Sequence, residues 1–408
     1  MDRFRKDADA IVKASIEAVL PDEAVGRALK NYKRPAGRLV LVAAGKAAWQ
    51  MAGAAAKTID VDEGFVITKY DHVMGEIPGV SCFEAGHPVP DQNGFDATEK
   101  VLGAVSGLSE NDEVLFLLSG GGSALFEKPL IPGEELQDIT SQLLAAGADI
   151  VEMNTIRKRL SGVKGGRFAL ACAPAKVYSI VLSDILGDPL DMIASGPAYP
   201  DGSTCEEAVE IAERYGLRLS DNVWDLLKQE TPKKLDNVTT EITGSVRDLC
   251  RAAAAECERL GYQTEILTDH LDCEASDAGR WLGKMVAENA GKGVKKAFIA
   301  GGETVVHLKG SGLGGRNQEL ALAAAQAVAG LDAAVFSFGS DGTDGPTDAA
   351  GGYVDGDTEA LLKKAGVSID DALSDNDAYH ALKACGGLIM TGPTGTNVND
   401  AAVVLVDA

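Results

Sequence analysis

The stretch GGETVVHLKGSGLGGRNQELALAAAQAVA, residues 301–329, is expected to combine a short strand, a glycine-rich turn and a helix. Its β-branched segment Thr304–Leu308 predicts a strand, half of a hairpin that begins at Gly301-Gly302, and an alanine- and leucine-rich helix should begin near Arg316. The turn between them contains Gly310, Gly312, Gly314 and Gly315. Backbone N–H groups at a glycine turn and at a helix N-terminus attract anions. We therefore expect an anion site here, with Arg316 as a charged contact.

Three of these glycines also satisfy G-x-G-x-x-G, a pattern shared by dinucleotide-binding turns and other phosphate cradles. The hairpin context disfavours a dinucleotide, because that fingerprint follows the first strand of a βαβ unit. The best candidate for a ribose-binding acid, Asp341, lies inside another glycine-rich loop. The alternative is a surface turn that needs glycine only for backbone shape. We favour a ligand-facing turn, because arginine, asparagine and glutamine follow the glycines directly.

Length and charge restrict the class of protein. The chain has 408 residues, which predicts two or three domains, and its apolar content of 45% is ample for packed cores. The net charge of −23 disfavours nucleic acid and anionic membranes as partners and favours a cytoplasmic protein. The seven cysteines lack metal-binding or paired spacing, which is typical of reduced intracellular thiols. Neither a signal peptide nor a membrane span is expected.

Strands alternate with helices, which predicts an open, mostly parallel α/β sheet with ligands beyond the carboxyl ends of the strands. The run Arg38–Ala44 is continuously apolar, as in strands buried on both faces. Residues 231–237 are polar and contain proline, so we expect a Rossmann-like N-terminal domain at residues 1–237 and a C-terminal α/β domain at 238–408. Other strands are expected at 65–68, 81–85, 113–118, 176–182, near 239, and at 264–267, 333–338 and 402–406. Two helices are expected within 3–30, and an alanine-rich helix should follow Gly45-Lys46 and end near Lys57. Further helices are expected at 91–105, 204–215, 221–229, 245–260 and 274–289.

Two loops follow predicted strands and carry groups that bind anions. Gly45-Lys46 ends the first buried strand, and a lysine is unfavourable at a helix N-terminus unless an anion binds there. A solvated lysine is an equally good interpretation of this pair alone. Ser119–Ser123 (SGGGS) follows the strand at 113–118, and its N–H and O–H donors suit a carboxylate or phosphate. This loop lacks the G-x-S-x-G pattern of a nucleophile elbow.

Three further segments carry charge or carboxylates. Residues 154–167 (NTIRKRLSGVKGGR) hold five basic residues, which predicts an anion-attracting wall, although a charged helix face is the common alternative. The loop at 183–191 holds Asp184, Asp188 and Asp191, which suit Mg²⁺ coordination or general-base chemistry. Residues 339–352 alternate aspartate with glycine but lack the final glutamate of a calcium loop, so a nucleotide- or Mg²⁺-facing loop is the better interpretation. No Walker A or H-E-x-x-H motif occurs, and the five histidines lack an evident triad partner.

Taken together, these blocks closely resemble the glycerate 2-kinase family, whose C-terminal part is known as the MOFRL domain. Eight segments carry the resemblance in order: AAGKAA (43–48), SGGGSAL (119–125), NTIRKRLSGVKGGR (154–167), SDILGDPLDMIASGP (183–197), GGET (301–304), GLGGRNQELAL (312–322), DGTDGPTDAAG (341–351) and GPTGTNVND (392–400). The resemblance implies ATP-dependent phosphorylation of D-glycerate at its 2-hydroxyl with Mg²⁺ or a similar ion. It also implies two α/β domains with the active site in the cleft between them.

The resemblance also implies roles for individual residues. Lys46 and Arg316 would face the phosphates and the substrate from opposite domains, and Asp188, with Asp184 second, would be the base or a metal ligand. The expected substrate contacts are Ser119, Gly121, Gly122, Ser123, Asn154, Arg159 and Lys164. The expected nucleotide contacts are Gly302, Glu303, Thr304, Gly314, Gly315, Asn317, Asp341, Thr343, Asp344 and Asn397.

Two other functions compete with the kinase. An NAD(P)-dependent hydroxypyruvate reductase would use the G-x-G-x-x-G turn, but the βαβ context and a catalytic histidine constellation are missing from the sequence. A non-catalytic sensor of sugar acids would be expected to lack Lys46, Arg316 or the loop aspartates, all of which are present. The sequence leaves a homodimer, the preferred nucleotide and the metal open.

Overall fold

The computed structural model describes residues 2–407. The chain forms two compact units. The N-terminal unit comprises Ala24–Ser183 and Asp188–Thr243, and the C-terminal unit comprises the chain up to Glu23, Asp184–Gly187 and the chain from Gly244 on. This division differs from the expected one at residue 237, because the first helix and part of the 183–191 loop group with the C-terminal unit. No helix within residues 2–407 combines the length and apolarity that a bilayer crossing needs.

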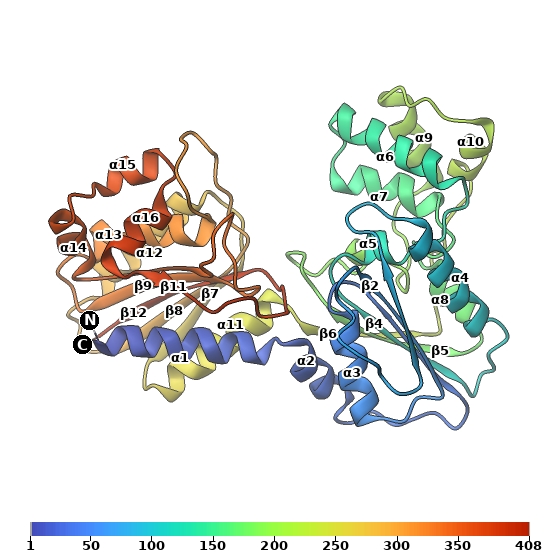
Figure 1. Cartoon of the computed structure of the whole chain (residues 1–408), viewed down its shortest axis with the longest axis horizontal. Coiled ribbons are helices and arrows are strands. Elements are labelled where there is room, and N and C mark those ends of the chain that lie inside the picture. Colours follow the sequence, from blue (N-terminus) through green and yellow to red (C-terminus); the bar gives the residue numbers. More distant parts are fainter. Residues whose placement is uncertain (1, 408) are drawn as a thin grey trace. The chain divides into compact units, whose positions relative to one another are not determined.

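A six-stranded sheet organises the N-terminal unit, in the order β3-β2-β1-β4-β5-β6 (Figure 1). The pairings from β3 to β5 are parallel, as predicted. All six residues of the central β1 are buried, which explains the continuous apolar run. The strands are β1 (Leu39–Ala44), β2 (Glu63–Lys69), β3 (Val80–Ala85), β4 (Glu113–Leu118), β5 (Lys176–Leu182) and β6 (Val238–Gly244).

Helices connect these strands. The chain crosses from β1 outward to β2 through α3 (Ala48–Thr58) and returns from β3 to β4 through α4 (Gln92–Val105). Right-handed crossovers in opposite directions place these two helices on opposite faces of the sheet. The remaining elements of the unit are α5 (Gly122–Leu125), α6 (Gly133–Ala146), α7 (Ile150–Arg159), α8 (Arg167–Cys172), a 3₁₀ turn (Ile193–Ser195), α9 (Cys205–Arg214) and α10 (Asp221–Leu227).

Four of these helices, α6, α7, α9 and α10, form a lobe with its own apolar core (Figure 1). Leu136 and Leu143 of α6, Ile156 of α7 and Ala208 of α9 are among its buried residues. The sequence predicted α9 and α10, but not a separate helical core.

The C-terminal unit contains a second six-stranded sheet, in the order β11-β10-β9-β12-β8-β7. Four of these strands (β7, β8, β9 and β11) run in one direction, whereas β12 and β10 run antiparallel to their neighbours. The sheet is therefore mixed, because the chain inserts its last strand antiparallel between β8 and β9. The strands are β7 (Gln263–Leu271), β8 (Lys296–Gly302), β9 (Ala333–Gly339), β10 (Gly351–Asp355), β11 (Leu388–Ile389) and β12 (Asp400–Val406).

Helices cover both faces of this sheet (Figure 1). The first helix of the chain, α1 (Asp2–Ala18), lies beside α11 (Val246–Arg259) on one face, and α2 (Pro21–Leu29) follows it. On the other face, α12 (Ala275–Asn289) packs against α13 (Arg316–Val328) over a core rich in alanine. The remaining helices are α14 (Thr358–Lys364), α15 (Ile369–Ser374) and α16 (Ala378–Cys385).

The predicted strand at Thr304–Leu308 is wrong. The strand of this region is β8, which ends at Gly302, and residues 304–308 form only an isolated bridge between Val305 and Glu274. Burial explains the error: the last six residues of β8 are buried, whereas the Val305 residue is 47% exposed and Leu308 is 82% exposed. The predicted hairpin is also wrong, because β8 pairs with β7 and β12. The helix does begin at Arg316, as expected.

Candidate active site

The two loops predicted to bind an anion in the N-terminal unit meet where the strand order reverses. β1 and β4 are neighbours, and Gly45-Lys46 and Ser119–Ser123 follow their carboxyl ends. The Lys46 N–H donates to the Gly120 carbonyl at 2.9 Å, and the Ala47 N–H donates to Ser119 Oγ at 3.0 Å. Ligands of open α/β sheets bind at such a reversal, so the topology supports a binding site here.

Glycine is required at two positions of these loops. Gly45 has a φ of +124°, and an added Cβ would lie 2.3 Å from Ser119 Oγ. Gly121 has a φ of +86°, and its added Cβ would lie 3.0 Å from two atoms of the His87 ring and 3.2 Å from Lys46 Cγ. Both the backbone conformation and the close approach exclude a side chain. The loops are therefore fixed in shape and held tightly together.

Lys46 is exposed, and its ammonium has no hydrogen-bond or ion-pair partner within residues 2–407. A cation without an internal carboxylate is available to an anionic ligand. Its predicted role in binding phosphate or substrate stays a prediction that this geometry supports.

A chain of polar groups supports the end of the SGGGS loop. Ser123 Oγ lies 3.2 Å from Ser195 Oγ, which in turn donates to Asn154 Oδ1 at 2.7 Å. Arg157 donates to the Ser123 carbonyl at 3.0 Å. Ala194 and Ser195 have positive φ values of 50° and 61°, an unfavourable conformation for residues other than glycine. Ser195 was not predicted as a site residue, because nothing in ASGP indicates its contact with Ser123, 72 residues earlier.

The loop at 183–191 places its aspartates differently. Asp188 has a φ of +52°, and its Oδ1 atom is buried without a hydrogen-bond partner within the described chain. An orphaned carboxylate oxygen is costly to bury, and a hydroxyl or a cation would satisfy it. Asp184 makes contacts of its own and groups with the C-terminal unit. Asp191 forms an ion pair with Lys158 at 3.4 Å.

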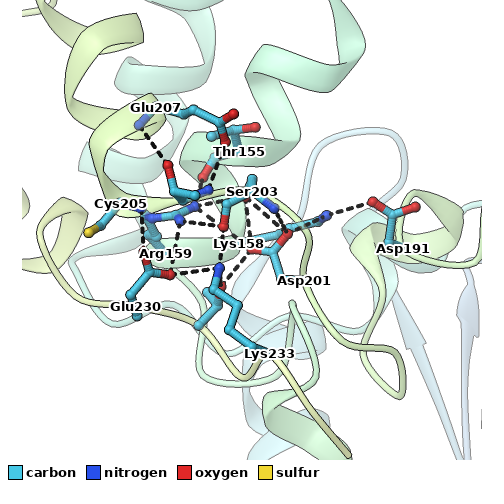
Figure 2. Close-up of polar contacts among 12 residues, drawn as sticks. Thr155, Lys158, Arg159, Asp191, Asp201, Ser203, Cys205, Glu207, Glu230 and Lys233 are labelled. Atoms are coloured by element: carbon cyan, nitrogen blue, oxygen red, sulfur yellow. Dashed lines mark hydrogen bonds and ion pairs between the residues drawn. The ribbon is translucent and has the colours of Figure 1, made fainter.

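Three of the five basic residues predicted to form an anion-attracting wall at residues 154–167 are buried: Lys158, Arg159 and Lys164. Figure 2 shows that Lys158 and Arg159 point into a network of protein groups. Arg159 is fully buried and donates to the Thr155 carbonyl, Ser203 Oγ and the Ser203 carbonyl at 2.8–3.0 Å. Lys158 is 3.0 Å from the buried Asp201. Arg159 is therefore a structural residue that ties α7 to the segment before α9, and we withdraw it from the expected substrate contacts.

Lys164 is also part of the interior. Its side chain is 0% exposed and forms an ion pair with the equally buried Glu127 at 2.8 Å. It also donates to the Phe126 carbonyl at 3.1 Å. Burial lowers the pKa of Lys164 to about 8, although Glu127 opposes this shift. The sequence could not indicate this, because a buried ion pair between residues 37 positions apart leaves no local pattern; we withdraw Lys164 as a substrate contact.

In the C-terminal unit, two carboxylates hold Arg316. Its guanidinium contacts both oxygens of Asp400, at 2.6 and 3.2 Å, and donates to Glu303 at 2.7 Å. Burial raises the pKa of Asp400 to about 6, and the charge of Arg316 opposes this shift. Asp400 is the first residue of β12, and sequence reasoning overlooked it although it ends the GPTGTNVND block. Arg316 retains an exposed third of its side chain.

The N-terminus of α13 binds an anion, but the anion is the protein's own. The carboxylate of Asp344 accepts hydrogen bonds from the Asn317 and Gln318 N–H groups at 3.1 and 2.9 Å. Asn317 also donates its side-chain amide to Asp344, and Ser337 donates to the Asn317 amide oxygen at 2.5 Å. Asp344 is thus a helix cap from a distant loop. The expectation that Asn317 and Asp344 contact a nucleotide is not supported by this arrangement.

The glycine turn at 310–315 is filled in the same way. The backbone N–H groups of residues 309–313 donate hydrogen bonds to oxygen atoms of the segment Asp375–Asp377, at 2.7–3.1 Å. An added Cβ at Gly312 would lie 2.4 Å from Asp377 Cβ, and one at Gly315 would lie 2.3 Å from the Asp344 side chain. The glycines therefore permit two loops to pack together, and the predicted phosphate cradle is wrong. Gly314 and Gly315 belong to this packed turn.

The remaining expected nucleotide contacts have local partners. Gly302 has a φ of +159°, and an added Cβ would lie 2.1 Å from the Leu271 carbonyl oxygen, so its role is structural. Thr304 is buried. Asp341 accepts from the Thr343 N–H at 2.9 Å, and Asn397 accepts from the Asn399 N–H at 3.2 Å. These contacts do not test a nucleotide role for Thr304, Asp341, Thr343 or Asn397.

Comparison with known proteins identifies the family. Residues 7–228 match a domain of unknown function (DUF4147), and residues 296–400 match the MOFRL family. The chain is 52% identical to D-glycerate 2-kinase from Thermotoga maritima over 99% of each protein. A crystal structure of glycerate kinase from Thermotoga maritima has a TM-score of 0.96 to this chain and covers 100% of both. A relative from Agrobacterium vitis with the provisional name hydroxypyruvate reductase is 39% identical over 97% of this chain and 93% of that protein.

The family inferred from the eight sequence blocks is thereby confirmed, as is the α/β class of both units. Both the identity and the coverage extend over the N-terminal and the C-terminal unit. The chain belongs to the glycerate 2-kinase family.

Proposed function

We propose that the protein transfers the γ-phosphoryl group of ATP to the 2-hydroxyl of D-glycerate, giving 2-phosphoglycerate and ADP. The observation that carries this proposal is the 52% identity to D-glycerate 2-kinase over nearly the whole of both chains. Phosphoryl transfer depends on positioning and on positive charge more than on a protein nucleophile. The described groups fit that demand, since they include donors for anions and an unsatisfied carboxylate.

In the N-terminal unit, Lys46 and the SGGGS loop would bind an anionic group of the reactants. Both reactants are anions, and the chain carries a net charge of −23, so they need a local source of positive charge and N–H donors. Lys46 is available because it lacks an internal partner within residues 2–407. Of the expected substrate contacts, Ser119, Gly121, Gly122, Ser123 and Asn154 remain in this proposal.

Asp188 would take the proton of the 2-hydroxyl as that oxygen attacks the γ-phosphorus and the bond to the ADP oxygen breaks. Its buried, unpartnered Oδ1 atom supports this role. The same atom fits Mg²⁺, which prefers carboxylate oxygens and would neutralise charge on the phosphates when bound. Asp184 stays the second candidate for either role. Replacement by asparagine at 188 should reduce kcat more than replacement at 184, and the reverse ranking would exchange the two roles.

In the C-terminal unit, Arg316 would contact a phosphate. A guanidinium has five N–H donors, and three hydrogen bonds to Asp400 and Glu303 leave two of them for a ligand. The two carboxylates fix the plane of the guanidinium before a ligand binds. This preorganisation would favour bidentate recognition of a phosphate.

The alternative, a hydroxypyruvate reductase, is favoured only by the provisional name of the Agrobacterium vitis relatives. The turn that would have held a dinucleotide is filled by Asp375–Asp377. The purified protein should be incubated with ATP, Mg²⁺ and D-glycerate and the product identified by ³¹P NMR. Formation of 2-phosphoglycerate is expected. NADH or NADPH oxidation with hydroxypyruvate, without ADP formation from glycerate, would overturn the kinase.

We also propose that the protein acts in the cytoplasm, on small molecules alone. Its strongly negative charge and its relatives named as kinases support this. Sedimentation of the purified protein would decide between a monomer and a homodimer.

A further inference from the structure

We propose that Lys69 and His87 complete, with Lys46 and the turn Ser119–Gly122, a binding site for a single oxyanion in the N-terminal unit. The oxyanion would be the carboxylate of the hydroxy acid or a phosphoryl group. Its identity rests on the proposed function, whereas the site itself rests on the arrangement of these groups. Neither Lys69 nor His87 belongs to the eight sequence blocks that carry the resemblance.

The first observation is the position of the His87 ring. A Cβ built on Gly121 would lie 3.0 Å from both Cδ2 and Nε2 of His87 and 3.2 Å from Cγ of Lys46. The imidazole and the lysine stem therefore both lie against the same glycine residue of the turn. No hydrogen bond to the His87 ring occurs within residues 2–407, so its ring nitrogens are available to a ligand.

The second observation is the convergence of four strand ends. Lys69 is the last residue of β2 and pairs with Ala85, the last residue of β3, which precedes His87 by two residues. Lys46 follows β1, and the turn follows β4. The carboxyl ends of parallel strands lie at one edge of a sheet, so all these groups reach the edge where ligands bind.

The third observation is the charge of this edge. Lys69, like Lys46, has no carboxylate partner within the described residues, although acidic residues outnumber basic ones by 61 to 38 in the chain. Burial lowers the pKa of His87, and the positive charges of Lys46 and Lys69 lower it further. A neutral imidazole beside two ammonium groups can still donate one N–H. Two cations, an N–H donor and a glycine-rich turn suit an oxyanion and disfavour a metal ion.

The fourth observation is the rigidity of the loop that carries His87. Asp91 anchors its far end by accepting from the Gly94 N–H at 3.0 Å and from the Tyr70 hydroxyl at 2.6 Å. At its near end, an added Cβ at Gly86 would lie 2.5 Å from the Val89 carbonyl oxygen. The loop is therefore folded tightly on itself, and His87 is held in place before any ligand binds.

Isothermal titration calorimetry of the full-length protein tests this site. Wild type, Lys69→Met, His87→Ala and His87→Asn would each be titrated separately with D-glycerate, with a non-hydrolysable ATP analogue and with inorganic phosphate. Lys57→Met is the matched control, since Lys57 is an exposed lysine at the opposite end of α3 from Lys46. Losing one charge-assisted hydrogen bond should weaken binding by about tenfold or more. His87→Asn retains an N–H donor and should recover part of the loss.

Weaker binding of D-glycerate alone would assign the site to the carboxylate, and weaker binding of the ATP analogue alone would assign it to a phosphoryl group. Unchanged affinity for all three ligands in Lys69→Met and His87→Ala would overturn the site, as would an equal loss in Lys57→Met. If wild type bound inorganic phosphate but neither reactant, and the variants lost the phosphate, the oxyanion site would stand and the proposed function would fail. Far-UV circular dichroism would check that each variant is folded before its affinity is compared.

Discussion

Two of the glycine-rich turns that come after strands, Ser119–Gly122 in the N-terminal unit and Gly310–Gly315 in the C-terminal unit, differ in the groups that lie against them. The turn at Ser119–Gly122 lies beside Lys46, whose ammonium has no acidic partner within residues 2–407. The turn at Gly310–Gly315 is filled by Asp375–Asp377 and by Asp344. Glycine content alone therefore identifies a place where something approaches the backbone closely. Whether that is a ligand or another loop depends on the partners that the chain itself provides.

The largest expected effect comes from removing the positive charge of Lys46 beside the turn at Ser119–Gly122. Lys46→Ala should reduce kcat/KM for D-glycerate phosphorylation about 100-fold or more, because a preorganised cation facing transferred charge contributes on that scale. The free energy of unfolding should change little, since the side chain is exposed and makes no ion pair within the described residues. Lys57→Ala is the control, and steady-state kinetics with urea unfolding is the measurement. Near-wild-type turnover in Lys46→Ala would contradict the proposal that only the turn at Ser119–Gly122 lies at a ligand site.

A second effect compares one glycine from each turn. Gly121→Ala forces a side chain into a left-handed conformation against His87 and Lys46, and Gly312→Ala forces one against the Asp375–Asp377 segment. Each should destabilise the fold by about 2 kcal/mol. Only Gly121→Ala should also raise KM in the folded fraction. Urea unfolding with kinetics at saturating and limiting D-glycerate measures both, and a raised KM in Gly312→Ala would contradict the contrast.

A third, smaller effect concerns the carboxylate that caps α13. Asp344→Ala removes an acceptor from the Asn317 and Gln318 N–H groups and should cost about 1 kcal/mol of stability. Asp348→Ala, in the same loop, loses only an exposed bond from the Tyr379 hydroxyl and is the control. Thermal unfolding monitored by circular dichroism compares them. Equal melting temperatures for the two variants would show that Asp344 is not a structural anion.

The smallest expected effect is a pH dependence of the free energy of unfolding, caused by Asp400, the partner of Arg316 in the C-terminal unit. The pKa of Asp400 is raised to about 6 in the folded protein, so its proton binds the folded state more tightly than the unfolded one. This contribution to stability is present at low pH and is lost as pH rises through 6. When the pH is lowered from 7 to 6, the free energy of unfolding of wild type should rise by about 0.4 kcal/mol relative to that of Asp400→Asn. Urea unfolding at both pH values measures it, and a gain in the opposite direction would mean that Arg316 dominates over burial.

Much of the fold was predictable, because a strand that is buried on both faces has a continuous run of apolar residues in the sequence. β1, β4 and β5 were placed within a residue of their ends by their apolar runs, and α13 by its alanine-rich pattern. The prediction of a strand at 304–308 was wrong because β-branched composition was taken as a sign of a strand. The β-branched residues there are exposed, whereas the buried strand is β8, which ends in two glycines. The antiparallel insertion of β12 and the grouping of α1 with the C-terminal unit depend on contacts that no local pattern records.

The site was predicted less well, because charge in a sequence does not reveal its partners. Lys46 and the SGGGS loop were proposed from their position after strands, and the structure places them together at the carboxyl ends of β1 and β4. Arg159 and Lys164 looked equally available, yet Asp201, Glu230 and Glu127 neutralise them in the interior. Ser195, Lys69 and His87 were missed, because each contacts its neighbours only through the tertiary fold.

The grouping of α1 with the C-terminal unit also has a consequence during synthesis. Ile11 and Val12 of α1 are buried, and Asp7 accepts a hydrogen bond from Tyr262 at 2.6 Å. The ribosome completes the whole N-terminal unit before it makes α11 and the sheet that receive this helix (Figure 1). At translation rates of about 5–20 residues per second, α1 is made roughly ten to fifty seconds ahead of α11, and the last strand of the sheet follows later still. Its apolar face would then be available to a nascent-chain chaperone, and we expect its docking to be a late event of folding.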